Sequence, residues 1–449
     1  MEISGECIFH NPPVLVAPTE ATPHRHALYL SNIDDQCFLH FPIQYIYVFT
    51  GALDVNALKI ALSRAFVDSY PPAGRLRASD EHDGKLVIDC NAKGALFAKG
   101  FLAGITAREF MLGCAKPHES QSFLCTPPLR IQVTHLSCGG TILCTAISHC
   151  VSDGFGAAHF LRAWAHAATS SELDNMHPAA PPFHDRRALA PRCPPRIAFA
   201  HPEYTVNSDG DAATMEAAWR LFAPPLSPVS VTFTAANVAW LKKIYATASS
   251  SVRGCTSFEA LAAHVWRAWV RALDPPASLR VKLLFTMDVR RLLVKEPKLP
   301  GEYCGNGFVL ACAESAAGEL VAAAPHAAKE VQECKKRIDD DYVRSVIDLL
   351  EVRRGCTTFT ISSLTRLGLE DIDFGAGRPI HFGPLTSEIY CLFLPVIGDP
   401  CGTTALVSVP QAAADAFERW CVDGLDAVDE GGENQLTAVK HLGDGVSTL

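Results

Sequence analysis

Residues 129–154 read LRIQVTHLSCGGTILCTAISHCVSDG, and this stretch decides the fold of the first half of the chain. Two apolar and β-branched runs, at 129–136 and 141–148, flank Cys138-Gly139-Gly140. Glycine supplies the positive φ angles that tight hairpin turns need. The segment therefore predicts an antiparallel hairpin, and its second strand runs directly into His149.

Strands and helices are mixed in the rest of the first half. The β-branched and aromatic run at 43–49 predicts a strand. Asp54 is a good N-cap residue and begins a predicted helix that ends near residue 65. A further helix is expected over about 155–168, directly after the hairpin.

The second half repeats this mixture without visible sequence repetition. Thr256-Ser257-Phe258-Glu259 has the pattern of a capping box and predicts a helix that ends near residue 273. The other expected elements are strands over 281–287, 387–396 and 403–409, and helices over about 313–337 and 411–421. The fold class predicted for the chain is therefore mixed α/β.

Length and composition exclude several classes of protein. The 449 residues suit two domains of ordinary size, and 48% apolar with 19% charged residues favours packed globular structure. The net charge is −9 and no run of Lys or Arg occurs, which argues against nucleic acid as a partner. No apolar stretch is long enough to span a membrane.

One composition shift divides the chain. Ten of the 30 prolines lie between Pro178 and Pro228, a density that blocks both helices and sheet ladders. We expect a long crossover at 178–228 between an N-terminal domain (1–177) and a C-terminal domain (229–426). A polar tail follows at 427–449.

Cysteine usage indicates a reducing compartment. The 17 cysteines are scattered and include no Cys-x-x-Cys pair, as expected of reduced, buried thiols in the cytoplasm. The first 27 residues lack the basic start and apolar run of a signal peptide. His24 and His26 form a close pair without a third ligand, so no metal site is expected.

His149 is the first candidate for chemistry, because it follows a strand and Asp153 comes four positions later. A neutral imidazole at the mouth of a strand can act as a general base, and a nearby carboxylate can orient it. A buried structural histidine has the same signature, so the spacing alone leaves both interpretations open. Gly154-Phe155-Gly156 resembles the start of a dinucleotide-binding loop, but His159 stands where the third glycine should be.

Four segments in a fixed order favour the catalytic interpretation. They are Tyr70-Pro71-Pro72-Ala73-Gly74-Arg75-Leu76, His149 to Gly154, Asp288-Val289-Arg290-Arg291-Leu292 followed by Gly305-Asn306, and Asp373-Phe374-Gly375-Ala376-Gly377-Arg378-Pro379. Together they closely resemble the BAHD family of plant acyl-CoA-dependent acyltransferases, in particular its hydroxycinnamoyltransferases. The hairpin and Phe183-His184-Asp185-Arg186-Arg187 in the crossover also fit. The resemblance runs from about residue 28 to residue 425.

The resemblance implies a fold of two similar chloramphenicol-acetyltransferase-like domains, with a channel between them and His149 near its middle. It implies acyl-CoA and a small alcohol as substrates and His149 as the general base. No covalent enzyme intermediate and no bound cofactor are needed, and the protein is expected to act as a monomer.

The resemblance also assigns roles to other residues. Asp153 belongs to the catalytic motif but is expected to face away from the substrate and to pair with Arg290, which supports the histidine loop. The remaining expected site residues are Gly154, Asp373, Gly375 and Gly377 as structural support, and Thr256 and Ser257 as contacts of a CoA phosphate. A helix N-terminus can bind a phosphate, but capping explains Thr256 equally well.

Three positions depart from the family pattern. Ala376 and Leu364 stand where tryptophan is usual, and Cys304 replaces a common phenylalanine. Smaller side chains at these positions should widen or reshape cavities near the channel.

The function expected from the sequence is transfer of an acyl group, with hydroxycinnamoyl favoured, from CoA to a phenylpropanoid or fatty alcohol. The segment Tyr29-Leu30-Ser31-Asn32-Ile33-Asp34 resembles relatives with such acceptors. One alternative is an N-acyltransferase on polyamines, in which Glu388 would bind the acceptor cation. Another is a non-catalytic accessory protein of wax-chain elongation.

Overall fold

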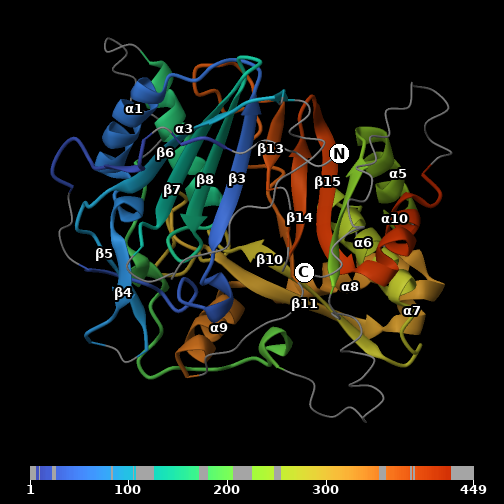
Figure 1. Ribbon diagram of the computed structural model, residues 1–449. Coiled ribbons are helices and arrows are strands. Elements are labelled where there is room, and N and C mark those ends of the chain that lie inside the picture. The colour runs from blue at the N-terminus through green and yellow to red at the C-terminus, as the bar shows by residue number, and fades with distance from the viewer. Residues whose placement is uncertain are drawn as a thin grey trace, which may run out of the picture.

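The computed structural model describes residues 7–425 except 10, 23–26, 82–83, 105, 108–125, 171–180, 206–224, 247–253, 353–359, 385–386 and 388–389. Glu388, His24, His26, the expected tail and parts of the expected crossover lie outside the described residues. The architecture is mixed α/β, as predicted, with two six-stranded sheets side by side and helices packed on each of them (Figure 1).

The predicted hairpin forms the centre of the first sheet. Strands β7 (Leu129–Leu136) and β8 (Thr141–Ser148) pair antiparallel, and Gly139 in the turn has a φ of 88°. The strand order is β1-β6-β7-β8-β3-β13. The other strands are β1 (Val14–Val16), β6 (Ala95–Leu102), β3 (Pro42–Phe49) and β13 (His381–Gly383).

Two helices cover one face of this sheet. They are α1 (Val55–Asp68), which Asp54 caps as predicted, and α3 (Gly154–Thr169). Trp164 of α3 is fully buried between them, and its indole N–H donates to Leu58 O at 2.9 Å. This packing fixes the start of α3, which directly follows the histidine loop (residues 149–153).

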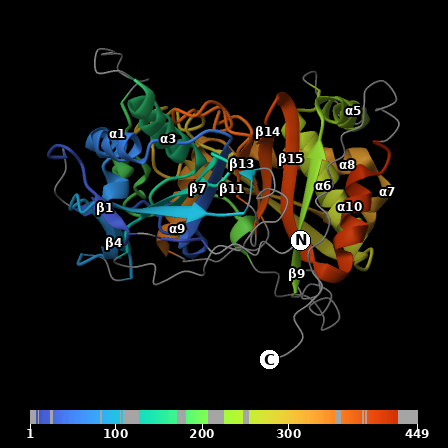
Figure 2. The ribbon, with the colours of Figure 1, turned by 45° about the horizontal axis from the view of Figure 1, so that its top comes forward.

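The second sheet has the order β11-β10-β12-β14-β15-β9. Its strands are β9 (Leu226–Phe233), β10 (Arg280–Asp288), β11 (Phe308–Ala316), β12 (Thr360–Ser363), β14 (Tyr390–Val396) and β15 (Asp399–Pro410). The helices beside it are α5 (Ala235–Ala246), α6 (Ser257–Leu273), α7 (Ala317–Ala322), α8 (Ala324–Arg337) and α10 (Ala414–Val422). Figure 2 shows them at the end of the molecule opposite α1 and α3.

The helix expected over 313–337 was wrong at its beginning. Residues 313–316 belong to β11, which pairs with β10 along nine positions from Phe308 to Ala316. Alanine favours a helix in isolation, but pairing with β10 and burial of Ala311 and Ala313 in the core outweigh that preference. The helical part is also divided, because α7 ends at Ala322 and α8 begins at Ala324.

A small third sheet and one more helix complete the described fold. The sheet contains β2 (Ala27–Tyr29), β5 (Leu86–Asp89) and β4 (Arg75–Ala78), and the helix is α9 (Asp340–Val352). No described helix is long and apolar enough to cross a membrane.

The two halves of the chain interlock. β13 lies in the second half of the sequence but pairs antiparallel with β3 of the first sheet, with Phe382 opposite Tyr47. Leu364, Leu369 and Phe374 pack in the same hydrophobic core as α1 and α3. The domain boundary at 228 stays a prediction. Seven buried residues of the described chain that follow it in the sequence belong to the first core, the hydrophobic core that contains α1 and α3.

Candidate active site

His149 lies at the end of β8, where the two six-stranded sheets approach each other. Its backbone N–H donates to Phe41 O at 2.9 Å. The partly buried imidazole lies between two aromatic rings, with centroid distances of 5.5 Å to Phe41 and 6.0 Å to Phe308. Burial lowers the pKa of His149, and hydrogen bonds and the nearby carboxylates of Asp153 and Asp34 offset this only in part. The ring is therefore neutral near pH 7, as a general base must be.

Asn306 fixes the tautomer of this imidazole. The Asn306 side-chain amide donates to His149 O at 2.7 Å and to Asp34 Oδ1 at 2.9 Å, which uses both of its hydrogens. Its Oδ1 lies 3.0 Å from His149 Nδ1 and can only accept, so Nδ1 must carry the proton. The lone pair of the neutral ring is then on Nε2, where it can take a proton from a substrate.

Asp34 holds Asn306 in place through hydrogen bonds. Asp34 Oδ1 also accepts the Asn306 backbone N–H at 2.8 Å, and Oδ2 accepts the Ser31 hydroxyl at 2.6 Å. The Arg186 guanidinium lies 3.5 Å from the same carboxylate. Asp34, Asn306 and Arg186 are all 0% exposed. The three residues therefore form a fully buried polar chain that ends at His149.

Asp153 contacts the backbone around the histidine loop, whereas Asn306 contacts the imidazole. Asp153 is the N-cap of α3, where Oδ1 accepts the Gly156 N–H at 3.0 Å, and Oδ2 accepts the Gly307 N–H at 3.0 Å. Arg290 Nη2 donates to both carboxylate oxygens, at 3.0 and 2.9 Å. Asp153 thus joins the histidine loop to residues 305–307, while Asn306 contacts the imidazole.

Arg290 connects several backbone groups around the Asp153 carboxylate. Its Nε donates to Tyr303 O at 2.9 Å and its Nη2 to Gly305 O at 3.0 Å, and the Phe155 ring lies 4.4 Å from the guanidinium. Burial acts to lower the pKa of Arg290, but Asp153 and Asp288 outweigh it and raise the pKa. Arg290 therefore remains charged and holds 303–307 against the histidine loop.

Glycine is needed where α3 begins, because the second half of the chain approaches closely. A Cβ on Gly156 would lie 2.5 Å from Cys304 O, too close for any side chain. A Cβ on Gly154 would lie 2.8 Å from a methyl group of Leu364. Leu364 is itself buried in the first core, so the first turn of α3 is part of the contact between the halves.

The Asp373 motif forms a turn that packs on the first core. Asp373 Oδ1 accepts the N–H groups of Gly375, at 2.7 Å, and Gly377, at 2.9 Å, and both glycines have positive φ angles. Phe374 packs edge-on against Trp164 at 4.9 Å. Ala376 lies against Gly51. These contacts describe a turn, and the supporting role expected for it stays a prediction.

Thr256 closes the N-terminus of α6 as a cap. Its hydroxyl accepts the Glu259 N–H at 3.3 Å, and Glu259 accepts the Thr256 N–H at 3.0 Å, which completes the predicted capping box. The Glu259 carboxylate also accepts from Gln332 and Lys335. The Glu259 carboxylate therefore lies at the helix N-terminus where Thr256 and Ser257 were expected to bind a CoA phosphate. That contact stays a prediction.

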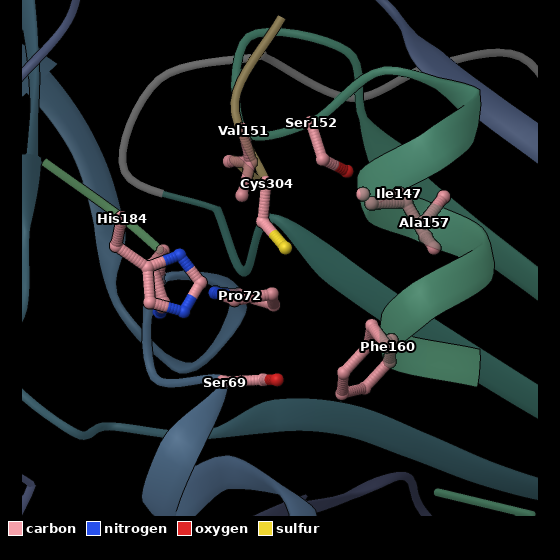
Figure 3. A pocket seen from close by; sticks show the side chains of 11 residues that line it. Ser69, Pro72, Ile147, Val151, Ser152, Ala157, Phe160, His184 and Cys304 are labelled. Carbon is pink, nitrogen blue, oxygen red and sulfur yellow. The ribbon is translucent and has the colours of Figure 1, made fainter. Parts of the chain in front are cut away.

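A small pocket lies behind the histidine loop, and the Cys304 sulfur points into it (Figure 3). Its apolar lining includes Pro72, Ile147, Val151, Ala157 and Phe160. Burial raises the pKa of the Cys304 thiol to about 12, so it stays protonated and is a poor nucleophile. Within the described ranges, no group of three or more His, Cys, Asp and Glu side chains is placed to hold a metal ion.

Sequence reasoning did not find the roles of Asn306, Asp34 and Arg186, although all three occur in quoted segments. Asn306 is 157 positions from His149 and 272 from Asp34. No spacing rule connects residues so far apart. The His149-x-x-x-Asp153 spacing, in contrast, marks the two ends of the histidine loop.

The chain is similar to known proteins over nearly its whole length. The model of the Transferase family matches residues 13–423. The omega-hydroxypalmitate O-feruloyl transferase of Arabidopsis thaliana is 34% identical over 91% of this chain and 91% of its own length. The fatty alcohol:caffeoyl-CoA acyltransferase of the same plant is 32% identical over 90% and 96%. The crystal structure of vinorine synthase superposes with a TM-score of 0.70 at 19% identity, covering 95% of this chain and 99% of that one. The chain thus belongs to the Transferase family, the BAHD acyltransferases, and is itself an acyltransferase.

Proposed function

We propose that the protein is an acyl-CoA-dependent O-acyltransferase in which His149 Nε2 removes the proton of an acceptor alcohol. The observation that carries this proposal is the pair of hydrogen bonds that Asn306 donates, because they leave Nδ1 as the protonated nitrogen. A general base of this kind contributes a rate factor of about 10² to 10⁴.

The transfer then needs only the imidazole and the two substrates. The acceptor oxygen attacks the thioester carbonyl while its proton moves to Nε2, which forms the new C–O bond. The tetrahedral intermediate collapses with cleavage of the C–S bond, and the imidazolium returns the proton to the CoA sulfur. The products are an ester and free CoA, and no enzyme group is acylated.

The buried chain behind His149 suits the charge that develops in this step. The imidazolium carries a positive charge on a ring whose Nδ1–H bonds to Asn306, and Asp34 lies directly behind that amide. Asp34 is one of the groups that raise the pKa of His149. It therefore favours the protonated ring that the transition state requires.

Hydroxycinnamoyl is the acyl group that the site and the relatives favour together. The names of two relatives include feruloyl or caffeoyl transfer to fatty alcohols or hydroxy acids. The half-buried ring of Phe41 beside His149 offers a flat apolar surface for a planar acyl group. The polyamine alternative depended on Glu388, which is outside the described residues.

Release of free CoA thiol tests the proposal. Acetyl-, malonyl-, p-coumaroyl-, caffeoyl- and feruloyl-CoA are each incubated with a phenolic alcohol, a long-chain alcohol or a polyamine. We expect thiol release that requires both a hydroxycinnamoyl-CoA and an alcohol, with the ester identified by mass spectrometry. Release with a polyamine alone would establish the N-acyltransferase, and silence from folded protein would favour the accessory role.

Asn306→Ala should change both the rate and its pH dependence. The base must be neutral, so kcat/KM is full above the pKa of His149 and falls as the pH decreases through it. Asn306 is one of the groups that raise this pKa, so its removal should move the acid limb to lower pH. Loss of the tautomer-fixing bond should lower kcat by about tenfold or more.

The measurement is kcat/KM from pH 4.5 to 8 for both proteins. Asn91→Ala, at a partly buried asparagine whose side chain bonds Asp89, is the matched control. An acid limb that moves to higher pH in Asn306→Ala would contradict the assigned orientation of the amide.

A further inference from the structure

We propose that Arg186, in the crossover between the two halves, is a positioning residue for His149. Its guanidinium holds the histidine loop on one side and Asp34, which holds Asn306, on the other. The inference rests on the proposed role of His149 as the base. It adds a residue from a third region of the chain, 37 positions after His149, to the control of that base.

The first contact fixes the backbone of the histidine loop. Arg186 begins a short 3-10 helix (Arg186–Leu189) and its side chain is fully buried. Nη2 donates to Val151 O at 2.6 Å, two residues after His149, and Nη1 donates to His184 O at 3.2 Å. The loop and the crossover are therefore held by the same side chain.

The second contact is with the buried chain that ends at the imidazole. Arg186 Nε lies 3.5 Å from Asp34 Oδ2, and Asp34 Oδ1 accepts two N–H groups of Asn306. Arg186 and Asp34 are both 0% exposed, so each leaves a buried, unneutralised charge when the other is lost. Burial acts to lower the pKa of Arg186, but Asp34 together with Tyr303, Cys304 and Tyr70 raises this pKa overall, so the guanidinium stays charged.

The third contact is between the Arg186 guanidinium and the residues just before Asn306. The Arg186 guanidinium lies 5.6 Å from the centre of the Tyr303 ring, and Arg290 lies 5.7 Å from the same ring. A Cβ on Gly305 would meet Arg186 Cζ at 2.9 Å. The backbone one residue before Asn306 therefore rests directly on the Arg186 guanidinium.

These contacts place the rigid Arg186 guanidinium between the histidine loop and Asp34. Val151 O belongs to the loop that carries the imidazole, and Asp34 holds the amide that fixes its tautomer. A lysine has one compact charge and cannot present donors in two directions with the planar geometry of arginine. Arg186→Lys should therefore keep the charge near Asp34 but loosen the alignment of Asn306 with His149.

The test is a double-mutant cycle of kcat. Wild type, Arg186→Lys, Asn306→Ala and the double variant are compared with a hydroxycinnamoyl-CoA and an alcohol. We expect Arg186→Lys to lose about tenfold in kcat with KM for the acyl-CoA changed less than threefold. The double variant should be no slower than Asn306→Ala, because both changes act through the same bond. Arg187→Lys, at the exposed neighbour, is the control and should match wild type.

Four results would overturn the inference. Additive losses in the double variant, or a change in KM alone, would show that Arg186 does not act through Asn306. Unchanged kcat in Arg186→Lys would exclude the positioning role outright. His149→Ala is measured beside them, and if it keeps near-normal turnover the proposed base is wrong, whatever Arg186 does. Should Arg186→Lys not fold, Arg186→Gln combined with Asp34→Asn replaces it, since this pair keeps a planar donor for Val151 O and leaves no buried carboxylate unneutralised.

Discussion

His149→Ala is expected to lower kcat by a factor of about 10² to 10⁴, with the fold intact. The substitution removes the imidazole at the end of β8, whose Nε2 carries the free lone pair. The proton of the acceptor alcohol then has to leave to water. We expect KM for acyl-CoA to change little. Stopped or continuous detection of CoA thiol, at saturating substrates, measures the loss.

The control for this experiment is a histidine of the same helix-and-loop region that does not face the site. His166 is exposed near the end of α3, and its ring nitrogens contact Ser170. His166→Ala should turn over like wild type. Turnover by His149→Ala within a few-fold of wild type, from protein with an unchanged melting temperature, would remove His149 from the chemistry.

Asp153→Ala is expected to cost about 3–5 kcal/mol of stability, because it leaves the Arg290 guanidinium buried without its main partner. It also removes the N-cap of α3, whose loss is worth about 1 kcal/mol. Activity should fall because the histidine loop loses its attachment to residues 305–307, which Arg290 and the Gly307 N–H provide. A thermal melt and turnover well below the melting temperature measure the two effects separately.

Two further variants separate support from catalysis. Asp153→Ala combined with Arg290→Met removes both charges, and we expect it to melt at a higher temperature than Asp153→Ala alone. Asp153→Asn keeps the size of the side chain and should retain more turnover than His149→Ala. A folded Asp153→Asn with normal stability and the activity of His149→Ala would instead place Asp153 in the proton transfer.

The elements of this fold that follow from local chemistry were predictable from the sequence. The glycine turn between two β-branched runs specified the β7–β8 hairpin, and Asp54 and Thr256 specified where α1 and α6 begin. Each of these depends on residues within a few positions of each other. The strand at 308–316 was missed because its alanines favour a helix, and only its pairing with β10 decides otherwise.

Only the residues of the His149-x-x-x-Asp153 motif could be identified as site residues from their spacing in the sequence. His149 and Asp153 lie on one loop, so their spacing marks them, and the family resemblance supplied Arg290 as the partner of Asp153. The amide that orients His149 could not be found in this way. Asn306 and Asp34 meet only after the first half, the crossover and the second half have assembled.

The placement of β13 has a consequence for making hybrids of such enzymes. A recombinant that joins the first 228 residues of this protein to the remainder of a relative would import a foreign strand into its first sheet. Residues 381–383 would then have to match Ile46, Tyr47 and Val48, their partners here. A junction placed between the two predicted domains therefore divides a hydrophobic core to which both halves of the chain contribute. Exchanging 360–383 together with the first half brings most of that core from a single parent, while Leu394 and Leu406 still come from the other.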